Sequence, residues 1–137
     1  MIPNTIKQEQ EISELLSRGY VQESGSNANG NYIKFSDGTM ICTYSFDLAD
    51  DAHFATSYGA IYYTTGGEKK WIFPQPFLKV YSVNGSLQLP SGIGGVGFSN
   101  NNDLTTFVKF YPYSVISFDF TGSSKKYVYL IAIGKWK

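Results

Sequence analysis

Residues 29–42 read NGNYIKFSDGTMIC, and this short segment decides the expected fold of the chain. The dipeptides Asn-Gly at 29–30 and Asp-Gly at 37–38 both tolerate the left-handed backbone that tight turns require. The residues between and after them are rich in aromatic and β-branched side chains, which favour an extended, pleated backbone. The segment therefore predicts two turns and a β-hairpin with strands at 31–36 and 39–47.

The rest of the chain continues this pattern, because short β-favouring runs alternate with turn signals up to the C-terminus. Residues 115–120 alternate apolar and polar side chains, which predicts a strand with one buried face. The last run, YVYLIAI at 127–133, is apolar on both sides and is expected at the centre of a sheet or between subunits. These patterns predict an all-β fold, a sandwich or a barrel. The further strands are predicted at 58–65, 70–73, 77–83, 86–90, 104–111, 113–121 and 126–136.

The N-terminal part contains the one convincing helix pattern, over residues 5–18, with Ile12, Leu15 and Leu16 on one face. A helix of this length is marginal alone in water, so it needs a partner surface. That surface is either the sheet of its own domain or further copies of the helix in a short coiled coil. The small, polar segment that follows is interpreted as a linker. The expected organisation is a helix in residues 1–22, a linker in 23–30 and a β domain in 31–137.

Composition limits the functions that the chain can have. At 137 residues it is long enough for one well-buried core, and eleven basic residues balance eleven acidic ones. This balance provides no overall positive field, so we expect no nucleic-acid partner. The single cysteine, Cys42, excludes an intrachain disulfide and is expected as a packed thiol in a reducing compartment. No window has the length or hydropathy of a membrane span and no signal-peptide pattern begins the chain, so we expect a soluble protein without membrane insertion.

Two local patterns contain residue types used in metal or cofactor sites but lack the sequence context that such sites need. His53 follows Asp47, Asp50 and Asp51, but the EF-hand pattern is missing and a single imidazole is a poor start for a zinc site. The run GIGGVG at 92–97 matches the dinucleotide-binding fingerprint in its letters, yet no helix pattern follows it. Its glycines are interpreted as points where backbones bend or approach closely. We therefore expect neither a metal nor a cofactor.

Sugar binding fits the composition better. A shallow saccharide site combines an aromatic platform with side chains that offer paired hydrogen-bond donors and acceptors. The loops around 50–58 and 99–103 contain this mixture, whereas most of the eleven tyrosines are interpreted as sheet packing. The candidate ligand-binding residues are Asp50, Asp51, His53, Tyr58, Asn100, Asn101, Asn102 and Asp103.

Three segments carry a family resemblance. The run at 29–42 resembles the opening of C-terminal tip domains in phage tail fibres and in related prophage or tail-like bacteriocin proteins. The run WIFPQPF at 71–77 resembles the central aromatic-Phe-Pro segment of that family, and IAIGKW at 131–136 resembles its closing strand. The three pieces occur in the expected order and together extend over residues 29–136.

The resemblance implies an antiparallel β-sandwich, similar in plan to H-type lectins, that forms a homotrimer at a fibre tip. Residues 5–18 would then end a trimeric stalk that continues the upstream tail-fibre shaft. The matching positions are mainly turn and core residues, so they imply an architecture and not a binding site. We expect a non-enzymatic domain that is made in the host cytoplasm, becomes part of the virion tail fibre tip and binds a bacterial cell-surface carbohydrate.

Two other functions remain open at this point. The domain could be a structural trimerisation or capping module of the tail, which would assemble without binding cells. It could also be a polysaccharide depolymerase, which requires a pair of carboxylates facing a groove. The loop carboxylates available for that chemistry are Asp47, Asp50, Asp51 and Asp103.

Overall fold

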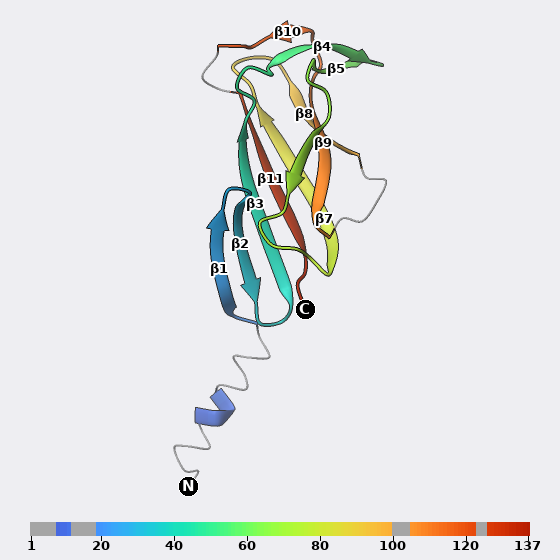
Figure 1. The fold of residues 1–137 in the computed structure, drawn as a ribbon. Helices are drawn as coiled ribbons and strands as arrows, with labels where there is room; N and C mark the ends of the chain where they lie inside the picture. Colours follow the sequence, from blue (N-terminus) through green and yellow to red (C-terminus); the bar gives the residue numbers. More distant parts are fainter. Residues whose placement is uncertain (1–7, 12–18, 100–104, 123–125) are drawn as a thin grey trace.

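A computed structural model describes residues 8–11, 19–99, 105–122 and 126–137 of the chain. Residues 8–11 are helical and exposed; the other residues of the helix predicted over 5–18 lie outside the described part. Within the described part, eleven strands form two antiparallel sheets (Figure 1). The fold is thus almost entirely β, as predicted, and its two sheets are consistent with a β-sandwich. None of the described helical residues belongs to a helix that is long and apolar enough to cross a membrane.

The first sheet, here called sheet A, has the strand order β1-β2-β3-β11-β7, and every neighbouring pair is antiparallel. The hairpin predicted from residues 29–42 is confirmed: Ile33 on β2 lies opposite Ile41 on β3. The two turn glycines, Gly30 and Gly38, adopt φ values of 119° and 98°. The strands are β1 (Val21–Asn27), β2 (Gly30–Phe35), β3 (Thr39–Asp47), β11 (Tyr127–Lys135) and β7 (Lys79–Gln88).

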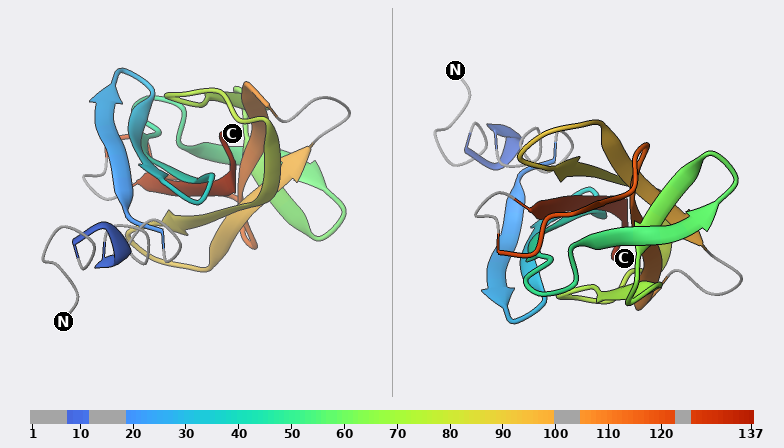
Figure 2. Two further views of the ribbon diagram at one scale, coloured as in Figure 1. Left: turned by 90° about the horizontal axis from the view of Figure 1, so that it is seen from below. Right: turned by 90° about the horizontal axis from the view of Figure 1, so that it is seen from above.

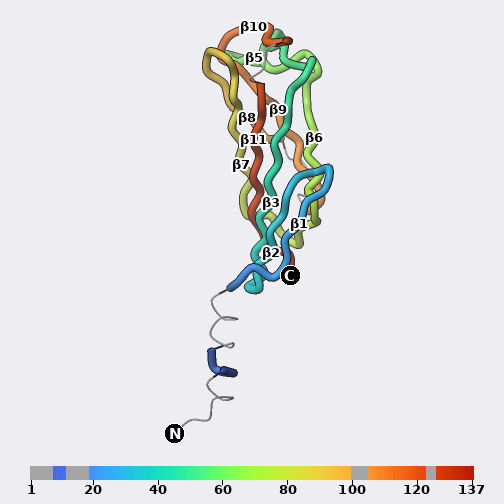
Figure 3. The backbone as a smooth tube through the Cα atoms, turned by 90° about the vertical axis from the view of Figure 1, so that its left-hand side faces the viewer, coloured from blue at the N-terminus to red at the C-terminus, as the bar shows by residue number. Residues whose placement is uncertain are grey.

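The second sheet, sheet B, has the order β10-β4-β5-β9-β6, and β8 also pairs with β9. The β4–β5 hairpin projects from the side of the domain, as the views of the domain from below and from above show (Figure 2). Strands β4, β5 and β10 lie at one end of the domain, whereas β1 begins and the chain terminates at the other (Figures 1 and 3). The strands are β10 (Phe118–Asp119), β4 (His53–Tyr58), β5 (Ile61–Thr64), β9 (Phe107–Ser114), β6 (Lys69–Ile72) and β8 (Gly94–Ser99).

The prediction of a linker at 23–30 is wrong, because most of these residues belong to β1. This strand pairs with β2 from Val21↔Phe35 to Asn27↔Gly30, and nearly all of its side chains are exposed. Its pairing therefore depends on backbone hydrogen bonds at the edge of sheet A, which leave no apolar pattern in the sequence.

Several predicted strand boundaries also differ from the structure. The region 58–65 contains the turn between β4 and β5, so a strand beginning at His53 was missed. The predicted strands 77–83 and 86–90 are one continuous strand, β7. The alternating segment 115–120 contains only the two residues of β10, and Ile116 and Phe118 are 45% and 50% exposed. Only Phe120 of that predicted face is buried, at 2% exposure.

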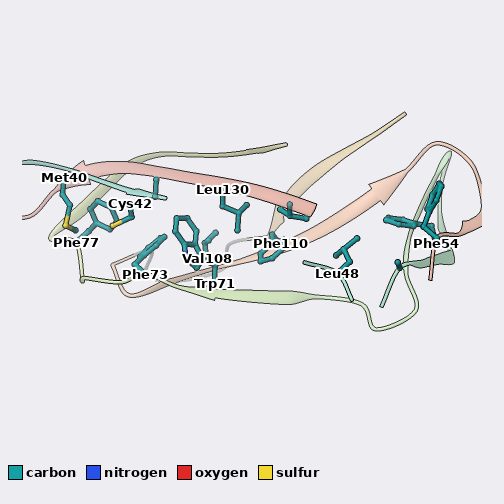
Figure 4. Close-up of a cluster of buried hydrophobic side chains, with 14 residues drawn as sticks. Met40, Cys42, Leu48, Phe54, Trp71, Phe73, Phe77, Val108, Phe110 and Leu130 are labelled. Carbon is teal, nitrogen blue, oxygen red and sulfur yellow. The ribbon is translucent and has the colours of Figure 1, made fainter. Parts of the chain in front are cut away.

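Large aromatic side chains fill the space between the two sheets (Figure 4). Tyr44 of sheet A stacks on Trp71 of sheet B, with ring centroids 6.2 Å apart, and Phe46 meets Phe110 edge to face at 5.9 Å. Burial of a large apolar side chain contributes about 1.5–3 kcal/mol, so these cross-sheet pairs account for much of the cohesion between the layers. Cys42 is fully buried in the same core, as predicted for a packed thiol, and burial raises its pKa to about 12.

The three segments that carry the family resemblance contact one another. The indole N–H of Trp71 donates to the carbonyl of Asn29 at 2.8 Å, and that of Trp136 donates to the carbonyl of Phe35, also at 2.8 Å. The amide of Asn27 donates to the carbonyl of Pro74 at 2.9 Å. The indole N–H of each tryptophan is thus hydrogen-bonded to a backbone carbonyl at one end of β2, while its ring packs inward.

Strand β11 is central in sheet A, between β3 and β7, as its two-sided apolar sequence predicted. Val128, Leu130 and Ala132 face the core, and the alternate residues face outward. On that outer side Ile33, Ile41 and Ile133 form one row across β2, β3 and β11, and Ile131 and Tyr129 follow along β11. Ile33, Ile131 and Tyr129 are 37%, 36% and 45% exposed, respectively. We call these five residues the isoleucine face.

Candidate functional site

The four predicted ligand-binding residues that the structure describes do not lie together in one site. His53 opens β4 and Tyr58 closes it, which places them about 17 Å apart along the strand. Asp50 is exposed in the turn that follows β3, and Asp51 lies next to it. The remaining four, Asn100, Asn101, Asn102 and Asp103, lie outside the described residues.

Asp51 is committed to a structural role. Its carboxylate forms an ion pair with Lys69, and it accepts a hydrogen bond of 3.0 Å from the backbone N–H of Gly66. Partial burial by itself raises the pKa of Asp51, but the hydrogen bonds from Lys69 and Gly66 and the charge of Lys69 together hold the pKa below its ordinary value. This carboxylate therefore ties the turn after β3 to the start of β6. It is not free to bind a sugar or to act as a catalytic acid.

His53 is exposed and lies opposite Asp119 in the β4–β10 pair. Asp119 has a lowered pKa, mainly because the side chain and the backbone N–H of Thr121 donate hydrogen bonds to it, with a smaller contribution from His53. Among the described residues, no group of three or more His, Cys, Asp or Glu side chains is placed to hold a metal ion. The His53 region is thus an ordinary polar edge of sheet B.

Tyr58, in contrast, lines a pocket on the outer face of sheet B. The pocket has a volume of about 430 Å³ and lies between the tip of the β4–β5 hairpin and the β8–β9 pair. Tyr58 is 74% exposed at its rim. No carboxylate is among the described lining residues, so the paired acids of a depolymerase are not found there. This tyrosine pocket is lined by Tyr58, Ile61, Tyr63, Gly97, Phe98, Ser99, Tyr111 and Tyr113.

Glycines on β8 and tyrosines on β9 build the floor of the pocket. Tyr113 lies opposite Gly95 and Tyr111 lies opposite Gly97 in the β8–β9 ladder. A Cβ atom added at Gly95 would come within 2.6 Å of the Tyr113 side chain, so the tyrosine occupies the space above that glycine. An aromatic ring laid over a cross-strand glycine compensates for the missing side chain and leaves a flat aromatic surface. The GIGGVG run thus serves backbone packing, as the sequence predicted.

The pocket tyrosines are held by neighbours on β5 and β9 and by Glu68, which directly precedes β6. Tyr63 of β5 meets Tyr111 of β9 edge to face, with ring centroids 5.4 Å apart. The hydroxyl of Tyr111 donates to a carboxylate oxygen of Glu68 at 3.0 Å, and the other oxygen of Glu68 lies 3.4 Å from Lys109 Nζ. The hydrogen bond to Glu68 is the main reason that the pKa of Tyr111 is raised. Tyr111 therefore remains a neutral phenol, fixed in orientation, over the ordinary pH range.

Sequence reasoning missed Tyr63, Tyr111 and Tyr113 as site residues, because their strands were interpreted as sheet packing. One signal was available: in FVKFYPYS at 107–114, Tyr111 and Tyr113 alternate with the buried Phe110 and Pro112. Two aromatic side chains on the outward face of a strand indicate an exposed aromatic surface. The β8 glycines lie beside these tyrosines because β8 pairs with β9. This pairing cannot be read from the local sequence of β9.

Comparison of the chain with protein-family models, with curated proteins and with solved structures gives no match. The arrangement of the site itself therefore carries the functional argument.

Proposed function

We propose that this chain is the receptor-binding tip domain of a phage or phage-like tail fibre, and that it binds a bacterial cell-surface glycan as a homotrimer without enzymatic activity. The observation that carries the proposal is the tyrosine pocket. A saccharide has apolar C–H faces that pack on aromatic rings and hydroxyls that exchange hydrogen bonds with polar groups. The four tyrosines, the hydroxyl of Ser99 and the strand backbone at Gly97 offer both kinds of contact.

The position of the pocket in the domain suits this role. Strand β1, where the chain enters the β domain, begins at the same end as the C-terminus, while the β4–β5 hairpin lies at the opposite end (Figures 1 and 3). A domain attached to the upstream shaft through its N-terminal side would direct the hairpin, and Tyr58 at its tip, away from the virion. The domain would be made in the host cytoplasm and act at the fibre tip.

The homotrimer is proposed because the isoleucine face exposes apolar side chains on a central strand. Contiguous exposed apolar surface is a common mark of a protein–protein contact. Three copies packed through this face would cover Ile33 and Ile131 and leave the outer face of sheet B free. Three weak pockets on one rigid tip raise the overall avidity by orders of magnitude, so each pocket need not bind tightly.

The proposal is tested with Tyr58→Ala, since this side chain is 74% exposed and its removal costs little folding energy. The matched control is Tyr81→Ala, a tyrosine that is 61% exposed on β7, outside the pocket. Binding of both variants to purified cell-wall polysaccharide and to a glycan array is compared with that of the original chain. We expect Tyr58→Ala to weaken binding at least about fivefold, the effect of losing roughly 1 kcal/mol at each site. Equal binding by the two variants would exclude the tyrosine pocket as the glycan-binding site.

A structural module of the tail is the second candidate function, and the isoleucine face is the observation that favours it. Such a module would assemble through that face and bind no cell. An oligomeric-mass measurement together with the binding assay separates the two functions. A trimer without affinity for any host polysaccharide supports the structural module, whereas a trimer that binds through Tyr58 supports the receptor-binding domain.

A further inference from the structure

We infer that the ligand of the tyrosine pocket is a saccharide that carries a negative charge, a phosphate or a carboxylate, and that Lys70 and Lys109 recognise this charge. The inference rests on the proposed function, which it narrows to a class of ligand. It is drawn from the arrangement of charged side chains beside the pocket on the outer face of sheet B.

The strand register places the two lysines next to the pocket. Lys70 on β6 lies opposite Lys109 on β9, and Lys109 lies opposite Ser99 on β8. The neighbouring pair along the β8–β9 ladder, Gly97 and Tyr111, is part of the pocket, as is Ser99 itself. Residues two apart on a strand share a face and are separated by about 7 Å. Lys109 is thus the next residue along β9 on the face that carries Tyr111, and Lys70 lies beside it. A substituent on a sugar that stacks on the tyrosines would be within reach of both lysines.

The two lysines form an unfavourable pair in the absence of a ligand. Like charges directly opposite each other on adjacent strands destabilise a sheet. Glu68 compensates Lys109 through its 3.4 Å contact, but it also accepts the hydrogen bond from Tyr111. Lys70 Nζ lies 4.1 Å from the centroid of the Phe107 ring, and among the described residues no carboxylate forms an ion pair with it.

This local positive charge is a property of the site and not of the whole chain. The chain carries equal numbers of basic and acidic residues, whereas Lys70, Lys109 and Glu68 together leave one unbalanced positive charge beside the pocket. A phosphate or carboxylate would accept charge-assisted hydrogen bonds from the ammonium groups and remove their mutual repulsion. The tyrosines would at the same time pack against the sugar ring that bears the anion.

The experiment compares the full chain with Lys70→Gln and Lys109→Gln on an array of bacterial polysaccharides. The array contains neutral, phosphate-bearing and uronate-bearing polymers, so that its arms distinguish the two anionic groups. The matched control is Lys79→Gln, because Lys79 is an exposed lysine on β7 whose Nζ lies 5.7 Å from the ring centroid of Tyr81. Thermal unfolding shows that each variant is folded, and Lys70→Gln is expected to be at least as stable as the original chain because it relieves a like-charge pair.

We expect the strongest binding on phosphate-bearing or uronate-bearing polymers and a loss of about tenfold in affinity in each pocket variant, the usual effect of removing one charge-assisted contact. The Lys79→Gln control should bind like the original chain, and added salt should weaken binding, since the charges are exposed. Binding that is strongest on neutral polymers, or that is unchanged in both pocket variants, overturns the inference. If Tyr58→Ala weakens this binding to neutral polymers at least about fivefold, the proposed function stands and only the charge assignment fails. If the chain binds neither polysaccharides nor host cells, both fail.

Discussion

The close packing of β8 on β9 leads to a sharp prediction about two glycines in one strand. A Cβ atom at Gly94 would lie 2.2 Å from the backbone oxygen of Tyr113 and 3.0 Å from Cδ2 of Leu87. A Cβ atom at Gly97 would meet only the backbone oxygen of Tyr111, at 3.9 Å, which is an ordinary contact. Gly94→Ala therefore forces the β8–β9 ladder apart by about 1 Å, whereas Gly97→Ala requires no movement.

The expected difference in the free energy of unfolding follows from the separate effect of each substitution. Overpacking of a tight site costs about 1–3 kcal/mol. An alanine that fits its site lowers the entropy of the unfolded chain and stabilises by about 0.4–1 kcal/mol. The two variants should therefore differ by about 2–3 kcal/mol in the free energy of unfolding. For a domain of this size that difference corresponds to a gap in Tm of roughly 8–12 °C.

The assay is thermal and urea unfolding followed by tryptophan fluorescence, because Trp71 lies buried between the sheets. All variants are measured at the same protein concentration, since the stability of an oligomer depends on it. Gly97→Ala is the matched control, with the same chemical change in the same strand. Equal stability of the two variants would refute the β8–β9 packing described above, and with it the floor of the tyrosine pocket.

Three further predictions address the core, the Asp51 ion pair and the isoleucine face. Cys42 should resist a thiol reagent in the folded protein and react fully in urea, because burial raises its pKa to about 12; rapid labelling of the folded chain would contradict this. Asp51→Asn should lose about 1–2 kcal/mol of unfolding free energy at pH 7, while the exposed control Asp50→Asn should lose little. The pKa of Asp51 is lowered in the folded state, so the stability that its carboxylate contributes is present above its ordinary pKa and is lost as the pH falls through the folded-state pKa. The difference in unfolding free energy between Asp51→Asn and the original chain, measured by urea titration, should therefore be smaller at pH 3 than at pH 7. Ile131→Glu should reduce the oligomeric mass measured by light scattering, while Val115→Glu, at an exposed position outside sheet A, should leave it unchanged; an unaltered mass for Ile131→Glu would exclude the isoleucine face as the contact between copies.

The parts of the fold that sequence reasoning predicted well are those with strong local signals. The β2–β3 hairpin combines two turn dipeptides with β-favouring residues, and β11, which is apolar on both faces, lies between β3 and β7 inside the sheet. Strand β1 carried no such signal, since its side chains face solvent. Asn84 and Gly85 resemble a turn, yet Gly85 lies inside β7, where a Cβ atom would come within 2.9 Å of Leu130. The missing side chain there serves close packing and not a bend.

The candidate site was harder to predict because it depends on contacts between distant parts of the sequence. Tyr58, which the sequence predicts as a ligand-binding residue, is exposed and lines the tyrosine pocket. Tyr63 and Tyr111 form one surface only because β5 and β9 are neighbours, although they are far apart in sequence. Asp51 was chosen for its carboxylate, but Lys69 and Gly66 occupy that group in the folded chain. A list of polar loop residues does not distinguish side chains that are free from those already engaged.

The place of β11 in sheet A constrains how the protein can be made. Its partners, β3 and β7, are synthesised long before it, and they contact each other only through this last strand. While the ribosome is still adding residues 127–135, both earlier strands lack a neighbour along one edge, and unpaired edges promote aggregation. Sheet A therefore cannot be completed before residues 127–135 have been synthesised. Loss of residues 127–135 would leave β3 and β7 without the strand that joins them.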